Sequence, residues 1–387
     1  MITRREYLKQ TALASCALAL PGALTAEPES SPETSPQSSI DGSQSLRAHA
    51  HKHGLLTGCA VGAANLHEDA FTRVLADQFS IVVAENAMKF GPLKPKPDAY
   101  FWDDADALVN FAHEHKMKVR GHNFVWHAQL PTWFKGVATK DNAKKILVDH
   151  IMAVGSRYKG KMQSWDVVNE ALNPPDGLPN GLRKSPWFEL LGPDYIELAF
   201  RTARRADPKA KLTYNDYGVE NDKEDNVVKR AATLALLKRL KAANAPIDAL
   251  GIQSHIHAGE TFGKGLRELI DGARGLGLEV YLTELDINDD TAKETDVAAI
   301  DRNVAATYTD YLSVALESKA VKAVLTWGLT DAHTWLGGFM MRPHAADDKQ
   351  PPAPPKPPQR PLPFDPNYKP APAFFAMRDA FDKAPHR

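Results

Sequence analysis

Eight short runs of β-branched and other apolar residues recur along this chain, and longer segments with helical periodicity separate them. The runs lie at residues 57–63, 80–84, 118–121, 164–168, 211–214, 249–252, 279–282 and 323–325. One intervening segment, residues 103–115, would place apolar Ala107, Leu108, Phe111 and Ala112 on one face of a helix. Eight strands that alternate with helices over roughly 330 residues predict a single (β/α)₈ barrel, the TIM barrel of the α/β class.

A doubly wound open sheet is the alternative that this alternation leaves open. It would require a Gly-rich phosphate-binding turn after an early strand, and the sequence has no such turn. A length of 387 residues with 43% hydrophobic content does not by itself distinguish one large core from two modest ones. The strand count favours one barrel domain over residues 46–387.

The first 26 residues have the features of a cleavable export signal. Arg4 and Arg5 precede an apolar run at residues 11–20, and the segment resembles a twin-arginine signal peptide. An ordinary secretory signal is the alternative, and both predict an exported protein, periplasmic or secreted. Cys16 completes a Leu-Ala-Ser-Cys sequence that leaves lipidation open. The apolar run is too short for a permanent membrane span, and no later segment qualifies, so no membrane association is expected without lipidation.

Two stretches have a composition that disfavours regular structure. Residues 27–45 are rich in Ser, Pro, Glu and Thr, with almost no large apolar residue, which predicts a disordered linker. Residues 342–372 include a proline-dense run at 351–358, and proline is excluded from helix interiors and central strands. We interpret this stretch as a surface loop, with the proline-rich insertion itself at about 342–361. A proline-recognition or sugar-contact element is the alternative.

Charge and cysteine content exclude several classes of protein. The net charge is −1 and no run of Lys or Arg occurs, so a nucleic-acid partner is not expected. The two cysteines, Cys16 and Cys59, lack metal-ligand spacing, so neither a disulfide scaffold nor a Cys-ligated zinc site is predicted.

Polar or aromatic side chains lie at the carboxyl ends of seven of the eight predicted strands. They are Glu85, Asn86, His122, Asn169, Glu170, Asn215, Asp216, Gln253, His255, Glu284 and Asp286, with Trp327 after the last strand. In a barrel these ends converge on one face, where the active site lies. Four tryptophans, Trp126, Trp133, Trp327 and Trp335, fall in the same loops, and their faces suit the C–H faces of sugar rings. We expect one or two of the four to be core residues instead.

Glu170 and Glu284 are the candidate catalytic pair. Glu170 ends the fourth predicted strand and Glu284 follows the seventh, which places both at the mouth of the barrel on facing sides. Glycoside hydrolysis needs two such carboxyl groups, one to protonate the leaving oxygen and one to attack the sugar or activate water.

Several segments together resemble glycoside hydrolase family 10, the retaining endo-β-1,4-xylanases, over about residues 54–376. They are 85–89 (Glu-Asn-Ala-Met-Lys), 120–122 (Arg-Gly-His), 125–131 (Val-Trp-His-Ala-Gln-Leu-Pro), 165–170 (Trp-Asp-Val-Val-Asn-Glu), 214–217 (Tyr-Asn-Asp-Tyr), 253–255 (Gln-Ser-His) and 283–286 (Thr-Glu-Leu-Asp). The resemblance implies that xylan and xylo-oligosaccharides are the binding partners. It implies no bound cofactor and no metal, and we expect a monomer.

The resemblance also implies a role for each matching residue. Glu170 is similar to the acid/base and Glu284 to the nucleophile, with His255 hydrogen-bonded to Glu284 and oriented by Asp286. Asn169 resembles the residue that binds the 2-hydroxyl of the attacked sugar. The residues that resemble the wall of the non-reducing-side sugar sites are Glu85, Asn86, Lys89, His122, Trp126, Gln253, Trp327 and Trp335. Tyr217 is a weaker match, on the leaving-group side.

The chain departs from the family pattern at a few positions. Asn123 and Phe124 stand where a small hydroxyl residue and Leu are more usual, and Gly218 stands where Asn is usual. The proline-rich insertion after Trp335, and Lys-Pro-Ala-Pro at residues 369–372, put the geometry of the last barrel turn in question. None of these departures touches the catalytic pair.

A retaining mechanism follows from the implied pair. Retaining enzymes hold their carboxyl groups about 5 to 5.5 Å apart, which leaves no room for a water between them. Glu284 would therefore attack the sugar itself, and its negative charge would favour the protonated form of Glu170. Once the glycosyl ester has neutralised Glu284, Glu170 can ionise and act as the base toward water.

Three alternative functions stay open at the sequence level. A related retaining β-1,4-glucanase is the nearest, although crowding by Trp327, Trp335 and Gln253 would exclude the hydroxymethyl arm of glucose. A metal-dependent barrel hydrolase is suggested by His255 and His257, but no Lys or His set completes a ligand shell. A non-catalytic glycan-binding protein is disfavoured because both carboxylates are present.

Overall fold

The strands close into a parallel barrel, as predicted. A computed structural model describes residues 40–289, 296–337 and 359–387. The barrel strands are β1 (Leu56–Val61), β2 (Ile81–Ala84), β3 (Lys118–Val125), β4 (Ser164–Asn169), β5 (Lys211–Asp216), β6 (Ala249–Ile252), β8 (Glu279–Asn288) and β9 (Val321–Thr326). Each pairs in parallel with its neighbours, and the β6–β8 and β1–β9 pairings close the ring. A short additional strand, β7 (His255–His257), pairs with the carboxyl end of β8.

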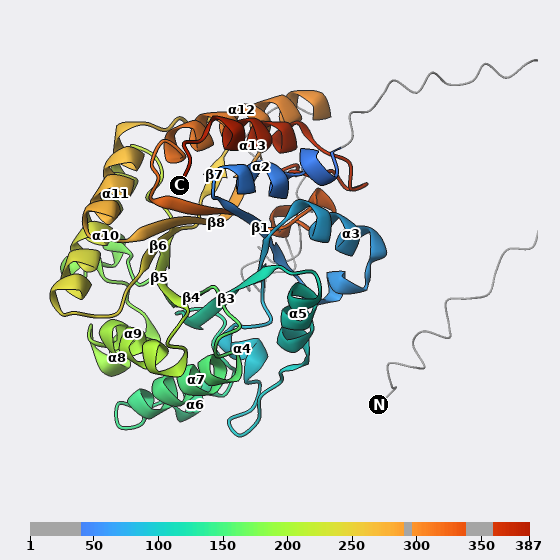
Figure 1. Cartoon of the computed structure of the whole chain (residues 1–387). Coiled ribbons are helices and arrows are strands. Elements are labelled where there is room, and N and C mark those ends of the chain that lie inside the picture. Colours follow the sequence, from blue (N-terminus) through green and yellow to red (C-terminus); the bar gives the residue numbers. More distant parts are fainter. Residues whose placement is uncertain (1–39, 290–295, 338–358) are drawn as a thin grey trace, which may run out of the picture. The chain divides into compact units, whose positions relative to one another are not determined.

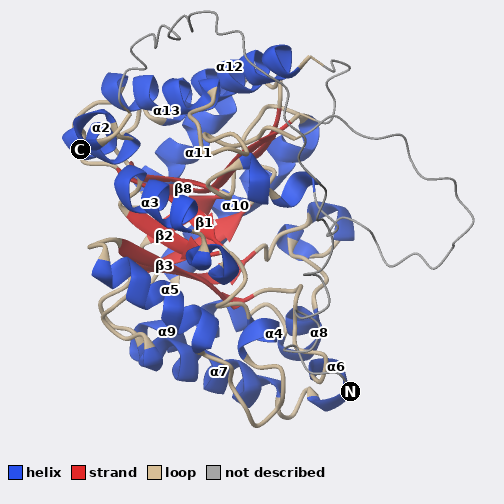
Figure 2. Ribbon diagram, turned by 90° about the vertical axis from the view of Figure 1, so that its right-hand side faces the viewer, coloured by secondary structure: helices blue, strands red, loops and turns tan. Residues whose placement is uncertain are grey.

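Helices surround the barrel and cover its outer surface (Figures 1 and 2). The α-helices are α2 (Leu46–Lys52), α3 (Asp69–Gln78), α4 (Phe90–Leu93), α5 (Asp103–Glu114), α6 (Phe134–Val137), α7 (Ala143–Arg157), α8 (Pro186–Leu191), α9 (Tyr195–Ala206), α10 (Glu224–Ala242), α11 (Lys264–Gly275), α12 (Val297–Ala315) and α13 (Pro372–Lys383). Short 3₁₀ helices are η1 (Gly42–Gln44), η2 (Ala63–His67), η3 (Pro174–Asp176), η4 (Pro179–Gly181), η5 (Asp331–His333) and η6 (Trp335–Gly337). Helices α2 and α13 pack side by side, which brings two segments far apart in the sequence together.

The barrel strands are apolar runs because both of their faces are buried. All four residues of β2 are buried, and so are all six of β4. A small inner cluster fills the barrel: Ala60, Ile81, Val83, Ala249, Tyr281, Ala323, Leu325 and Trp327. Gly121 in β3 leaves room for the ring of Trp165 on β4, since a Cβ at position 121 would overlap that ring. The close packing of the two strands therefore depends on this glycine.

Five strands continue past their predicted carboxyl ends, and β3 and β8 do so furthest. β3 continues past Gly121 to Val125, and β8 continues past Leu282 to Asn288. His122, Glu284 and Asp286 therefore lie within strands rather than after them. The extension of β8 is supported by its pairing with β7, which places Asp286 opposite His255.

Helix α5 confirms the predicted helix but not its complete buried face. Leu108 and Ala112 are buried, whereas Ala107 is exposed and Phe111 is only half-buried. Ala105 and Val109 complete the buried face. Residues 105, 108, 109 and 112 form the stripe that is buried, so the predicted stripe was about a quarter of a turn off.

The structure corrects the boundaries of both biased stretches. Residues 40–45 were predicted as the end of a disordered linker, but they include η1, and Ser45 caps α2 by accepting a hydrogen bond from the N–H of Ala48 at 3.2 Å. Residues 359–372 were interpreted as part of a surface loop. Leu362 and Phe364 are instead fully buried, and Tyr308 donates to the carbonyl oxygen of Pro361 at 2.8 Å. Local composition does not reveal this anchoring, because its partners lie more than 50 residues away.

Several predictions concern residues outside the described ranges. These are the signal segment 1–26 with Cys16, the linker up to residue 39, and the insertion at residues 342–358. Cys59 is buried in β1 and has a free thiol. Over residues 40–289, 296–337 and 359–387, we find no helix with the length and apolar character needed to cross a membrane.

Candidate active site

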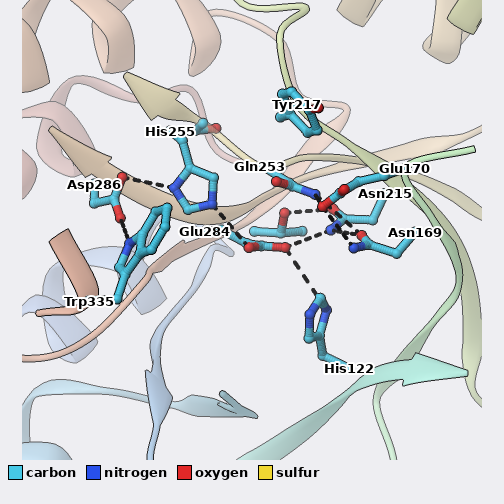
Figure 3. Close-up of polar contacts among 12 residues, drawn as sticks. His122, Asn169, Glu170, Asn215, Tyr217, Gln253, His255, Glu284, Asp286 and Trp335 are labelled. Atoms are coloured by element: carbon cyan, nitrogen blue, oxygen red, sulfur yellow. Dashed lines mark hydrogen bonds and ion pairs between the residues drawn. The ribbon is translucent and has the colours of Figure 1, made fainter. Parts of the chain in front are cut away.

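A cavity of about 550 Å³ opens at the carboxyl ends of the barrel strands, and the predicted site residues meet there (Figure 3). Its lining consists of Glu85, Asn86, Lys89, His122, Trp126, Gln129, Asn169, Glu170, Tyr217, Gln253, His255, Glu284, Trp327 and Trp335. Only Asp286 among the predicted site residues is not in this lining, because it lies behind His255. Gln129 was not predicted. Gln129 belongs to the 125–131 segment that carries the family resemblance. Its backbone is left-handed (φ 46°), a conformation that the sequence pattern did not predict.

Glu284 lies in β8 and is nearly completely buried among hydrogen-bond donors. Its Oε1 accepts from Nδ2 of Asn215 at 2.8 Å, and its Oε2 lies 3.2 Å from Nε2 of His255. Burial alone would raise the pKa of this carboxyl group. The hydrogen bond from His255 and the charges of His122, His255 and Lys89 outweigh burial and lower the pKa of Glu284 to about 2. Glu284 is therefore an ionised carboxylate at any ordinary pH.

Glu170 directly follows β4 and has a left-handed backbone, with φ 58°. Its N–H donates to the carbonyl oxygen of Asn215 at 2.9 Å. The side-chain oxygen Oε1 accepts from Nδ2 of Asn169 at 3.1 Å and from Nε2 of Gln253 at 3.0 Å. Nδ1 of His127 is 3.7 Å from the other oxygen, Oε2. Because two amide donors occupy Oε1, a proton on this carboxyl group belongs on Oε2.

Two asparagines connect the carboxyl groups of the pair. Nδ2 of Asn215 donates to Oδ1 of Asn169 at 2.9 Å as well as to Glu284, and Nδ2 of Asn169 donates to Glu170. The hydroxyl of Thr283 donates to Oδ1 of Asn215 at 2.7 Å and thereby fixes which end of this amide faces Glu284. Asn215 was noted at a strand end but not selected as a site residue. Both carboxylates are thus held by one continuous set of amide groups, visible in Figure 3.

His255 connects Glu284 to Asp286 and Trp335. Nδ1 of His255 is 2.8 Å from Oδ1 of Asp286, whose Oδ2 accepts from the indole N–H of Trp335 at 2.6 Å. Burial opposes protonation of the imidazole. Attraction to Asp286 and Glu284 outweighs it and raises the pKa of His255 well above its ordinary value. As an imidazolium, His255 can donate to both carboxylates, which confirms the predicted contacts of His255.

A second histidine approaches Glu284 from β3. Nδ1 of His122 is 2.9 Å from Oδ2 of Asp166 and 3.9 Å from Oε1 of Glu284. Asp166 in turn pairs with Arg120, and both of these side chains are 1% exposed. The guanidinium of Arg120 also donates to the hydroxyl of Ser164 at 2.9 Å. Sequence reasoning selected His122 but not the buried ion pair behind it.

One wall of the cavity combines a lysine with indole rings. Nζ of Lys89 lies 5.0 Å from the ring centroid of Trp126 and 5.8 Å from that of Trp327, and it donates to Oδ1 of Asn86 at 3.0 Å. Burial lowers the pKa of Lys89 and raises the pKa of Glu85, while their mutual attraction opposes both shifts. This wall offers hydrogen bonds and aromatic faces together, as sugar hydroxyls and ring C–H groups require.

Trp133 does not belong to the cavity. Its ring packs edge to face on Phe90 with centroids 5.7 Å apart, and its indole N–H donates to the carbonyl oxygen of Lys94 at 2.9 Å. Trp133 is half-buried and packs against the hydrophobic core, whereas the other three tryptophans line the cavity and Trp327 is also part of the inner barrel cluster.

Tyr217 follows β5 at the other end of the cavity. Its ring lies 3.7 Å from Nζ of Lys229, and its hydroxyl accepts from the guanidinium of Arg183 at 3.1 Å. Gly218, one of the departures from the family pattern, has φ +66°, a conformation that glycine and asparagine both tolerate. The other departures face inward: Phe124 stacks on Trp165, and Nδ2 of Asn123 is 3.3 Å from Nε2 of His122.

The sequence model of the family described as glycosyl hydrolase family 10 matches residues 45–380. This chain belongs to glycosyl hydrolase family 10.

Relatives and solved structures agree with this family assignment. The family 10 chain is 37% identical over 315 residues to endo-1,4-beta-xylanase A of Xylanibacter ruminicola, a match that spans 73% of this chain and 83% of the relative. Native xylanase 10B from Thermotoga maritima superimposes with a TM-score of 0.77 at 33% identity, covering 88% of this chain and 98% of that one. Xylanase 10B from Thermotoga petrophila RKU-1, solved in complex with xylobiose, superimposes with a TM-score of 0.76 at 33% identity. The match covers 88% of this chain and 97% of that one.

The contacts of His255 bear on the metal-dependent alternative. Both of its ring nitrogens face carboxylates of the family 10 site, so neither has a free lone pair for a metal ion. Within the described ranges, no group of three or more His, Cys, Asp or Glu side chains is arranged to hold a metal ion.

Proposed function

We propose that this family 10 protein is an endo-1,4-β-xylanase that cleaves internal bonds of xylan and xylo-oligosaccharides with retention of anomeric configuration. The observation that carries the proposal is a pair of carboxyl groups in one cavity with different surroundings. Glu284 is surrounded by His255, His122 and Asn215 and is ionised, whereas Glu170 has one oxygen without an amide donor. The names of the similar proteins, endo-1,4-beta-xylanase A and xylanase 10B, support xylan as the substrate class.

In the first step, Glu284 attacks the anomeric carbon of the sugar while the bond from that carbon to the leaving oxygen breaks. Glu170 donates the proton on Oε2 to that oxygen, so the departing chain leaves as an alcohol. The product of this step is a glycosyl ester on Glu284. Formation of the ester removes the negative charge of Glu284 and leaves Glu170 ionised.

In the second step, the ionised Glu170 accepts a proton from water as the water oxygen attacks the anomeric carbon. The ester bond to Glu284 breaks and restores its carboxylate. Asn169, which lies between the two carboxyl groups, is placed to bind the 2-hydroxyl of the attacked sugar. The chain returns to its starting protonation state, and the two inversions give net retention.

The wall made by Lys89, Trp126, Trp327 and Trp335 binds the non-reducing part of the substrate in this proposal. Xylose lacks the hydroxymethyl group of glucose, and indole rings packed this closely favour the smaller sugar. The similar xylanase 10B from Thermotoga petrophila RKU-1 was solved in complex with xylobiose, and this supports short xylo-oligosaccharides as ligands.

Product analysis on several polysaccharides tests the proposal. Purified protein should release xylo-oligosaccharides from glucuronoxylan and arabinoxylan and have little activity on carboxymethyl-cellulose, and NMR should show the β-anomer as the first product. Higher turnover on carboxymethyl-cellulose would make the protein a glucanase. Loss of activity after exhaustive chelation would favour the metal-dependent alternative.

Export through the twin-arginine route is a further part of the proposal. The Arg4-Arg5 pair and the apolar run at residues 11–20 support it. Replacing both arginines by lysine should retain the precursor in the cytoplasm, because twin-arginine receptors require the pair, whereas an ordinary secretory signal would tolerate the change. Unchanged export of the variant would indicate the ordinary route.

We also propose that the protein acts as a monomer. The described residues that line the cavity, both carboxyl groups included, belong to a single chain, so the proposed chemistry needs no second copy. Size-exclusion chromatography with light scattering should give the mass of a single chain.

A further inference from the structure

Arg183 holds the backbone of the proposed proton donor. The loop after β4 returns toward Glu170, because Leu172 and Leu182 form an antiparallel bridge and the N–H of Arg183 donates to the carbonyl oxygen of Ala171 at 2.8 Å. This return places the guanidinium directly behind Glu170, where Nε donates to the carbonyl oxygen of Glu170 at 2.6 Å. The family resemblance and the strand-end pattern did not select Arg183.

The same guanidinium reaches the leaving-group end of the cavity. A terminal nitrogen of Arg183 donates to the hydroxyl of Tyr217 at 3.1 Å and to the carbonyl oxygen of Leu172 at 3.3 Å. The planar fork of arginine makes these contacts simultaneously, which the single ammonium group of lysine cannot do. Arg183 therefore connects the backbone of Glu170 to Tyr217, the residue expected beside the departing sugar.

Glu170 is a residue whose backbone needs such support. A φ of 58° is unfavourable for a residue with a Cβ and persists only where the surroundings hold it. Two hydrogen bonds hold the backbone of Glu170: its N–H donates to the backbone carbonyl oxygen of Asn215, and its own carbonyl oxygen accepts from Arg183. The direction of the carboxyl group depends on this backbone. The backbone conformation fixes the direction of the Cα–Cβ bond, and the side chain extends from that bond.

The guanidinium is half-buried and keeps its charge. Burial alone would lower the pKa of Arg183. The hydroxyl of Tyr217 and the charges of Glu170 and Asp216 outweigh burial and raise the pKa. The three groups that accept its hydrogen bonds are the carbonyl oxygens of Glu170 and Leu172 and the hydroxyl of Tyr217. The guanidinium therefore positions neutral oxygen atoms through these hydrogen bonds.

We infer that Arg183 is a positioning residue for Glu170, which keeps the carboxyl group aimed at the leaving oxygen and ties its backbone to the leaving-group side of the cavity. The inference rests on the proposed role of Glu170 as the acid/base. Arg183 acts through Glu170 and touches no reacting atom in this account. Its loss should therefore affect the bond cleavage that needs a proton and spare the cleavage that does not.

The test compares two leaving groups in the Arg183→Met variant. With xylotetraose, whose leaving alcohol needs the proton, kcat/KM should fall about 100-fold, the size of effect that misplacing a catalytic group by about 1 Å produces. With dinitrophenyl xylobioside, whose phenolate leaves unprotonated, the rate of glycosylation should change less than about threefold. Arg183→Lys keeps the charge and most of the volume, and should give the same split with a smaller loss on xylotetraose.

Arg204→Met is the matched control. Arg204 also holds two backbone carbonyl oxygens, those of Pro208 at 3.0 Å and Ala210 at 2.8 Å, but it does so at the amino end of β5, away from the cavity. Because this arginine is purely structural, its replacement should change the rates on the two substrates by the same factor. The melting temperature of each variant is recorded, and if Arg183→Met does not fold, the lysine variant decides.

Equal losses on the two substrates, or no loss on xylotetraose, in a folded Arg183 variant would overturn the inference. Glu170→Ala is measured beside it. If Glu170→Ala shows the leaving-group split and the Arg183 variants do not, only the positioning role is wrong. If Glu170→Ala itself shows no split, the assignment of the acid/base is wrong.

Discussion

His255 and Glu284 form the contact that sets the charge of the proposed nucleophile: Nε2 of the imidazole lies 3.2 Å from Oε2 of the carboxylate. Asp286 on the other side of the ring makes His255 an imidazolium, and this cation holds the pKa of Glu284 at about 2 despite burial. The strand pairing of β7 with β8 builds the contact, since it places His255 opposite Asp286. A change at His255 should therefore appear in the pH dependence of catalysis.

His255→Ala should slow glycosylation at least about tenfold and move the acidic limb of the kcat/KM profile upward. The limb moves to higher pH because the nucleophile must be ionised to attack. Activity falls as pH drops through the pKa of Glu284, and loss of the imidazolium raises that pKa from about 2. In the native protein this limb lies near the pKa of Glu284, about 2, and in the variant it should lie at a higher pH.

His257→Ala is the control for this profile. His257 lies two residues further along β7, and its side chain is exposed. Its variant should keep the native profile. An acidic limb that stays unchanged in His255→Ala would show that His255 does not set the charge of Glu284.

Asp166→Asn tests the buried ion pair behind His122. The substitution removes the charge that compensates Arg120, and both side chains are 1% exposed. Breaking a buried pair by removing one partner costs about 3 to 5 kcal/mol of unfolding free energy. Urea unfolding measures the loss. Asp149→Asn, which removes an exposed i,i+4 pair with Lys145, should cost less than about 1 kcal/mol. Equal midpoints for the two variants would show that the buried pair is dispensable for stability.

A pair of deletions tests the proline-rich insertion. Replacing residues 342–358 by a short Gly/Ser linker should leave the melting temperature within a few degrees, because this composition has no periodic apolar face. Extending the deletion through residue 361 removes Arg360, whose guanidinium pairs with Asp301, and Pro361, whose carbonyl oxygen accepts from Tyr308. This longer deletion should lower the melting temperature by about 3 °C or more below that of the shorter deletion, because a loss of about 2 kcal/mol corresponds to about 3 °C in a domain of this size. Similar melting temperatures for the two deletions would show that the segment at 359–361 does not anchor the fold.

The barrel and the location of Glu170 and Glu284 in one cavity could be predicted because their signals are local. Each strand appears as a short apolar run, and in a parallel barrel the residue at its carboxyl end faces the site whatever the rest of the chain does. Glu170 and Glu284 were selected by position in this way. The ends of β3 and β8 were misplaced because polar residues interrupt the apolar run of each strand, at His122 and Asn123 in β3 and at Glu284 and Asp286 in β8.

The contacts that orient the pair could not be predicted from local patterns. Asn215 joins Asn169 and Glu284 over separations of 46 and 69 residues, and its strand-end position alone does not distinguish it from a turn residue. Arg183 lies in a loop rich in Gly, Pro and Asn, where an arginine is usually a solvated charge. Both act through backbone or amide geometry that only the folded chain brings together.

The most direct test of the central claim is the response of the two glutamates to the leaving group. Glu170→Ala should lose most activity on xylan, yet form the covalent intermediate from dinitrophenyl xylobioside in a burst, followed by slow hydrolysis for lack of a base. Azide needs no deprotonation and should accelerate the second step, giving a β-glycosyl azide. Glu284→Ala should lose activity on both substrates, because the variant lacks the attacking oxygen atom. If Glu170→Ala instead lost both substrates equally while Glu284→Ala retained the activated one, the proposed roles of the two carboxyl groups would be reversed.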